Sequence, residues 1–109
     1  MPVGGRKRRY LVIKIISQGR VDGGAFRLAL VKSLAKLFGE VGLAKASLKF
    51  LSFNDEEKAA VVGCDRAFLN ELRAAVALMS EVNNKAICPF VAKVSGTVKG
   101  AKVALKEGG

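Results

Sequence analysis

The spacing of apolar residues changes from that of a strand to that of a helix and back again along the chain, and this order is the strongest constraint on its fold. Residues 10–17 are short and rich in β-branched side chains, which predicts a strand. Asp22 then caps a predicted helix that starts near residue 25 and stops at Gly39 and Gly42. Residues 47–53 and 58–64 predict a hairpin of two further strands.

The second half of the chain repeats the change from helix to strand. Asp65 is a suitable N-cap for a second helix, and five apolar residues follow it at helical spacing: Phe68, Leu72, Ala75, Met79 and Val82. Residues 85–94 predict a fourth strand. The tail from Gly96 is either a short helix or mobile, and the sequence leaves both alternatives open.

This order predicts an α+β fold, the ferredoxin-like (RRM-like) βαββαβ two-layer sandwich, with two helices on one face of a four-stranded antiparallel sheet. In that topology the strands lie in the order fourth, first, third, second, so Pro89 falls on an edge strand that tolerates its missing N–H. Cys64 and Cys88 are then separated by an intervening strand and stay reduced, as buried thiols. We expect one domain over residues 1–109, with a basic arm (1–9) and a tail (96–109).

The charge of the chain points to a polyanionic partner. Nineteen Lys and Arg against nine Asp and Glu leave a net charge of +10, for which nucleic acid is the first candidate and a membrane surface the alternative. No apolar run approaches the roughly 20 residues of a spanning helix. Lys14 interrupts the apolar run after the basic start, which argues against a secretory signal, and we expect a cytoplasmic protein.

The predicted topology gathers basic residues at one edge of the sheet, where strand and helix ends meet, and a basic edge suits RNA phosphates. The expected RNA-binding residues are Arg6, Lys7, Arg8, Arg9, Lys45, Arg66, Lys93 and Lys99. The acidic turn at residues 55–57 falls at the opposite edge. Two alternatives remain open: these side chains only solvate the surface, or residues 6–9 form a disordered basic arm.

The sheet face away from the helices is the expected site of a protein partner. If Lys14, Lys49 and Lys93 point away from the helices, period two places an apolar set beside them: Tyr10, Val12, Ile16, Leu51, Phe53, Ile87 and Val91. Residues 58–64 lack the RNP pattern of an RNA-recognition sheet, so a protein is favoured as occupant. A shifted register, or a tail folded over this face, is the alternative.

The residues also argue against intrinsic catalysis. The chain contains no histidine, its carboxylates are dispersed apart from Asp55, Glu56 and Glu57, and its glycines match no phosphate-binding loop. The acidic turn is interpreted as a solvated loop, with a Mg²⁺ site as the alternative. We therefore expect no catalytic residue, no metal ligand and no cofactor held by the protein.

Four segments resemble one known family. They are RYLVIKI (9–15), LFGEVGLAKASLKFL (37–51), ELRAAVALM (71–79) and VAKVSGT (91–97). In this order they resemble the Pop-five protein subunits of archaeal and eukaryotic ribonuclease P, of the type called ribonuclease P protein component 2. The similarity extends from residue 9 to about residue 102, and the short chain looks archaeal.

The resemblance implies a subunit that stabilises the catalytic RNA of ribonuclease P, which removes the 5′ leader of precursor tRNA with Mg²⁺ held by RNA. It also implies a TIM-barrel-like protein partner and self-association of two such pairs into a heterotetramer. No site is carried onto residues 18–25, where the chain departs from the family. The alternatives are a basic protein-binding adaptor in another RNA–protein complex and a protein nuclease that acts alone.

Overall fold

The computed structural model describes the backbone of residues 7–106 and the side chains of residues 7–102. Its elements follow in the order β1 (Arg8–Ile16), α1 (Gly23–Ala46), β2 (Lys49–Asn54), β3 (Ala59–Asp65), the 3₁₀ helix η1 (Arg66–Phe68), α2 (Leu69–Leu78), β4 (Glu81–Val82), β5 (Lys85–Ala86), β6 (Cys88–Ser95) and α3 (Val98–Lys106). Among these residues no helix is both long enough and apolar enough to cross a membrane.

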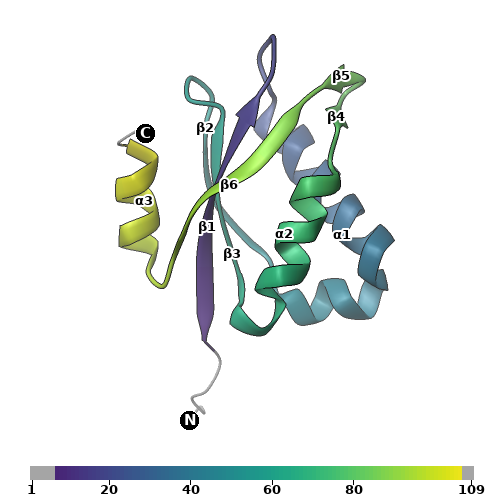
Figure 1. Ribbon diagram of the computed structural model, residues 1–109, viewed down its shortest axis with the longest axis vertical. Coiled ribbons are helices and arrows are strands. Elements are labelled where there is room, and N and C mark those ends of the chain that lie inside the picture. Colours follow the sequence, from purple (N-terminus) through teal and green to yellow (C-terminus); the bar gives the residue numbers. More distant parts are fainter. Residues whose placement is uncertain (1–6, 107–109) are drawn as a thin grey trace.

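The main sheet has the predicted order and direction. Its strands lie as β2-β3-β1-β6, and each neighbouring pair is antiparallel. The helices α1 and α2 cover one face, while α3 lies against the other (Figure 1). This arrangement confirms the ferredoxin-like sandwich, with β6 as an edge strand that carries Pro89. The predicted fourth strand is divided, because residues 85–86 pair with β4 in a separate hairpin.

The predicted cap Asp22 is confirmed for α1, whereas Asp65 caps the short 3₁₀ helix η1 that leads into α2 rather than α2 itself. The Asp22 Oδ2 atom accepts a hydrogen bond from the Ala25 N–H at 2.9 Å, and the Asp65 Oδ1 atom accepts one from the Ala67 N–H at 2.9 Å. The predicted end of the first helix is wrong. Gly39 adopts φ +73° and kinks α1, but the chain returns to helical geometry and continues to Ala46. A glycine tolerates positive φ at little cost, so it can kink a helix without ending it.

The core between the sheet and the helices is built from alternate residues of β1. Leu11, Ile13 and Ile15 point toward the helices and pack with Phe26 and Leu72, among others. Val82 also joins this core, but from β4 rather than from the second helix, because α2 ends at Leu78. A smaller cluster lies on the opposite face of the sheet, which we call the open face, and there α3 supplies the fully buried Ala101.

Two β-bulges change which face several side chains occupy. Phe50 and Ser52 pair with the adjacent residues Val62 and Val61, so Leu51 is an extra residue in β2. In the same way Ala92 is an extra residue in β6, because its two neighbours pair with consecutive residues of β1. Since successive strand residues alternate between faces, one extra residue reverses the side of all that follow. The bulges place Phe53 and Val91 in the helix-facing core.

The expected apolar face is therefore partly wrong. Phe53, Ile87 and Val91 belong to the core under the helices, whereas Tyr10, Val12 and Leu51 lie on the open face as expected. The side chain of Ile16 is 63% exposed, at the end of β1. Both alternatives to the expected apolar face are therefore observed: the register is shifted by the bulges, and the tail folds over the sheet as α3.

The two cysteines lie on strands separated by β1 and are both free thiols. Cys64 is fully buried, and burial raises the pKa of its thiol to about 11. Cys88 is exposed, so the prediction that both thiols are buried is wrong for this residue. The neighbouring Pro89 is buried instead, because successive strand residues point to opposite faces.

We predict that a thiol-reactive reagent at pH 8 labels one cysteine in the native protein and two after unfolding in guanidinium chloride. The reactive species is the thiolate, which Cys64 does not form at this pH because of its raised pKa, and the reagent cannot reach it. Intact-protein mass spectrometry counts the labels. In the variant Cys88→Ser the native protein should take up none, and labelling of that variant at the wild-type rate would contradict the assignment.

Candidate nucleic-acid interface

Three segments that are distant in the sequence meet at one edge of the sheet, namely the side where β1 begins and β3 ends. Arg8 at the start of β1 lies opposite Asp65 at the end of β3, and the Arg66 N–H donates to the Lys7 carbonyl oxygen at 2.9 Å. The last turn of α1, which carries Lys45, leads into Ser47 beside them. We call these residues the basic rim: Lys7, Arg8, Arg9, Lys45 and Arg66.

Arg8 holds the basic rim together from within. Its Nη2 atom donates to the Ser47 carbonyl oxygen at 2.8 Å and its Nη1 atom donates to the Ser47 Oγ atom at 3.3 Å. The side chain passes over Gly63, where a Cβ atom would lie 3.3 Å from Nη2. Arg8 therefore ties β1 to the end of α1, a role that no motif in the sequence indicates.

The other rim residues differ in how far they can reach a ligand. Arg9 is half-buried and its Nη1 atom donates to the Arg8 carbonyl oxygen at 2.9 Å. Lys7, Lys45 and Arg66 are exposed. These three cations, which come from three separate segments of the chain, are the rim charges most available to an external phosphate.

Two other expected RNA-binding residues lie away from the rim. Lys93 is exposed on β6 opposite Val12, near the middle of β1, and Lys99 is exposed in the first turn of α3. Both therefore lie at the open face of the sheet rather than at the basic rim. Arg6 lies outside the described residues.

The opposite end of the sheet is predominantly acidic. Residues 55–57 form the turn between β2 and β3, and Asp22 and Glu81 lie at the same end. The Arg20 Nη2 atom lies 3.6 Å from the Asp55 Oδ2 atom, but their side chains are 88% and 60% exposed, so the pair contributes little to stability. Within residues 7–106 no three His, Cys, Asp or Glu side chains are grouped so that they could hold a metal ion.

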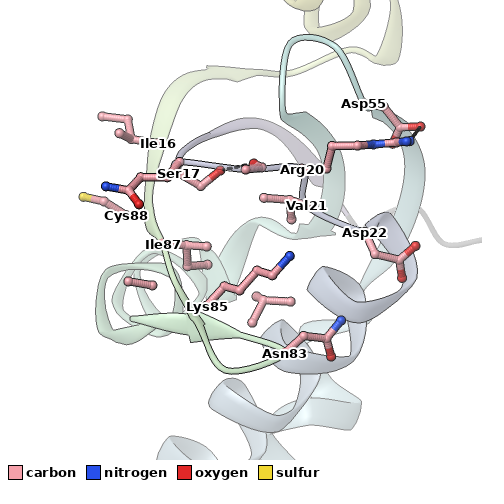
Figure 2. A pocket seen from close by; sticks show the side chains of 14 residues that line it. Ile16, Ser17, Arg20, Val21, Asp22, Asp55, Asn83, Lys85, Ile87 and Cys88 are labelled. Carbon is pink, nitrogen blue, oxygen red and sulfur yellow. Dashed lines mark hydrogen bonds and ion pairs between the residues drawn. The ribbon is translucent and has the colours of Figure 1, made fainter.

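A pocket of about 980 Å³ lies at this acidic end, between the loop after β1 and the β4–β5 hairpin. Figure 2 shows Arg20 directed toward Asp55 and Lys85 extending from the hairpin across the pocket. The inner wall is apolar, with Val21, Val82 and Ile87 among its residues. Sequence reasoning missed this pocket, because its walls at residues 16–22 and 82–88 are distant in the chain and only the fold brings them together.

Most of the large exposed apolar side chains lie on the helices, although Ile16 of β1 and Phe90 of β6 are also exposed. Leu37, Phe38 and Val41 surround the kink in α1 and are 39%, 37% and 68% exposed, and Leu78 of α2 is 64% exposed. Phe38 can occupy its position only because residue 42 is a glycine. A Cβ atom at Gly42 would lie 2.6 Å from the Phe38 Cβ atom. The glycines within LFGEVG were the available signal in the sequence, but they were interpreted as a helix end.

We predict that Arg8→Ala lowers the free energy of unfolding by about 1–2 kcal/mol, because it removes hydrogen bonds from a charged donor to partly buried acceptors. The matched control Lys45→Ala removes an exposed rim charge and should change that free energy by less than about 0.5 kcal/mol. Urea denaturation followed by circular dichroism measures both variants. Equal effects would show that Arg8 is an ordinary surface cation.

Comparisons with known proteins agree on one family. The sequence profile of the Rpp14/Pop5 family matches residues 9–106. "Ribonuclease P protein component 2" of Pyrococcus horikoshii is 34% identical over 96 residues, which cover 88% of this chain and 80% of that protein. The protein of the same name from Archaeoglobus fulgidus is 31% identical over 96 residues, or 88% of this chain and 85% of that protein.

A solved structure shares the fold. A chain in the cryo-EM structure of yeast ribonuclease MRP superposes with a TM-score of 0.70, at 17% identity, over 95% of this chain and 89% of that chain. At this level of identity the likeness supports the topology of sheet and helices alone.

Proposed function

The chain belongs to the Rpp14/Pop5 family, and from this premise we propose that it is a protein subunit of ribonuclease P. In this role it binds and stabilises the catalytic RNA for the removal of the 5′ leader of precursor tRNA. The observation that carries the RNA-binding part of the proposal is the convergence of Lys7, Lys45 and Arg66 at one edge of the sheet. Cations grouped in this way neutralise neighbouring phosphates, which otherwise repel each other.

The RNA, rather than the protein, performs the chemistry in this proposal. Mg²⁺ is held by RNA at the active site, and the protein contributes no catalytic residue, metal ligand or cofactor. The charge segregation supports this division, because the acidic end that would repel RNA lies at the opposite edge from the basic rim. We place the complex in the cytoplasm.

A protein partner completes the proposed assembly. We propose that a TIM-barrel-like ribonuclease P subunit binds this chain and that two such pairs associate into a heterotetramer. The exposed apolar side chains around the kink of α1 support a protein contact, since such groups are uncommon on surfaces without a partner.

The same apolar surface favours a second candidate function, a basic protein-binding adaptor in another RNA–protein complex. In that case Lys7, Lys45 and Arg66 serve solubility, and removal of their charge leaves RNA binding unchanged. The two functions are therefore separated by charge reversal at the basic rim.

We predict that this protein, together with its TIM-barrel-like partner, lowers the Mg²⁺ concentration at which ribonuclease P RNA cleaves precursor tRNA, while the proteins alone cleave nothing. The triple variant Lys7→Glu/Lys45→Glu/Arg66→Glu should bind the RNA at least tenfold more weakly. Its logarithmic salt slope should be smaller by about 2, since each lost phosphate contact removes about 0.7–0.9.

The matched control reverses three exposed cations elsewhere: Arg20→Glu, Lys32→Glu and Lys85→Glu. Both triple variants change the net charge equally, so a general effect of charge would weaken binding in both. Cleavage across a Mg²⁺ series and filter binding across a salt series provide the measurements. Wild-type RNA affinity in the rim variant would support the adaptor instead, and equal weakening in both triple variants would show a general effect of charge.

A further inference from the structure

The open face of the sheet carries an aromatic ring over a glycine, next to the Arg8 side chain. Tyr10 of β1 lies opposite Gly63 of β3, and a Cβ atom at Gly63 would lie 2.9 Å from the Tyr10 Cε1 atom and 3.0 Å from its Cδ1 atom. The ring therefore lies across the glycine, close to the surface of the sheet. A flat aromatic ring on an open sheet is a surface on which a nucleic-acid base can stack.

Cations surround this ring in the sheet register. Lys49 of β2 is opposite Gly63 in the same row, and Lys93 of β6 is opposite Val12 in the next row. Both side chains are exposed, and both backbones lie within about 10 Å of Tyr10, or two strand spacings. Small buried residues, Ala59 and Val61, continue the surface along β3.

Helix α3 covers this surface as a short strap. It leaves β6 through the turn Ser95-Gly96-Thr97, and the Thr97 Oγ1 atom caps it by accepting a hydrogen bond from the Gly100 N–H at 3.0 Å. Among its described side chains, residues 98–102, Ala101 is the fully buried one, while Lys99 and Lys102 point to solvent. Alanine is a small apolar anchor, and a helix of 9 residues is marginal in water once it loses its packing.

The charges of strap and sheet are of the same sign. Lys99 and Lys102 of α3 lie above a face bordered by Lys49 and Lys93. Since like charges repel, the docked state of α3 is less stable than its apolar contact alone would make it. This repulsion favours the state in which α3 is lifted from the sheet.

We propose that the open face is a second RNA surface, specific for single-stranded RNA, which α3 covers in the free protein and exposes when it lifts. One base stacks on Tyr10, and Lys49 and Lys93 contact the flanking phosphates. This inference deepens the proposed role in ribonuclease P and rests on it for the source of the RNA. The basic rim, by contrast, contacts phosphates without discriminating single strands from duplexes.

The chain provides its own spectroscopic reporter. Tyr10 is its single tyrosine and it has no tryptophan, so tyrosine emission reports the open face alone. The first experiment titrates a 12-nucleotide oligouridylate into wild-type protein and into Ala101→Gln, whose larger side chain does not fit between α3 and the sheet. The matched control Ala74→Gln makes the same change at an exposed position of α2.

We expect Ala101→Gln to bind the oligonucleotide at least tenfold more tightly than wild type, with quenching of Tyr10 emission, while Ala74→Gln matches wild type. A duplex of the same length should not quench. Tyr10→Ala added to Ala101→Gln should then weaken binding about tenfold, as judged by anisotropy of a labelled oligonucleotide. Equal affinity of wild type and a folded Ala101→Gln, without quenching, would overturn the proposal.

A second measurement uses wild-type protein and does not depend on the folding of a variant. If RNA lifts α3, the oligonucleotide should accelerate trypsin cleavage after Lys99 and Lys102, and protection of these sites would overturn the proposal. Self-association of Ala101→Gln without RNA binding, seen by sedimentation, would instead make the face a protein surface. Neither experiment involves precursor tRNA cleavage, so this inference can fail while the subunit function stands.

Discussion

Every element of the main sheet takes its position from β1, an apolar strand that pairs with β3 on one side and β6 on the other. Because it is central, its two faces must both be covered, and its alternate residues divide the molecule into two layers. Leu11, Ile13 and Ile15 direct α1 and α2 to one face, while Val12 lies beneath α3 on the other. The start of β1 then determines where the charged residues gather, since Arg8 ties it to the end of α1.

The fold could be predicted from the sequence to the extent that it depends on local signals. The caps Asp22 and Asp65 and the change of apolar period along the chain led to the correct strand order. The faces of β2 and β6 could not be predicted, because the bulges at Leu51 and Ala92 leave no local pattern and arise from pairing with β3 and β1. Phe53 and Val91 were misplaced for that reason.

The same distinction applies to the candidate interface. Topology alone brought Lys7, Lys45 and Arg66 to one edge of the sheet, and the structure has them there. Topology could not reveal that Arg8 donates hydrogen bonds to Ser47. The Arg8 side chain reaches Ser47 by passing over Gly63, which has no side chain in its way. Topology also could not place the apolar surface around the kink of α1. The sequence does not show that the helix continues beyond Gly39, because a glycine can equally well end a helix. The resemblance to the Pop-five family identified the function class, whereas the residues on their own indicated a polyanion and a protein as partners.

The central claim of this account is that RNA meets the protein at the basic rim rather than over its whole cationic surface. Lysine acetylation with and without ribonuclease P RNA, read out by peptide mass spectrometry, tests it directly. The account predicts that RNA protects Lys7 and Lys45 at least severalfold while Lys85, exposed at the acidic end, reacts at its rate in the free protein. Equal protection of all three lysines, or protection of Lys85 alone, would contradict the claim.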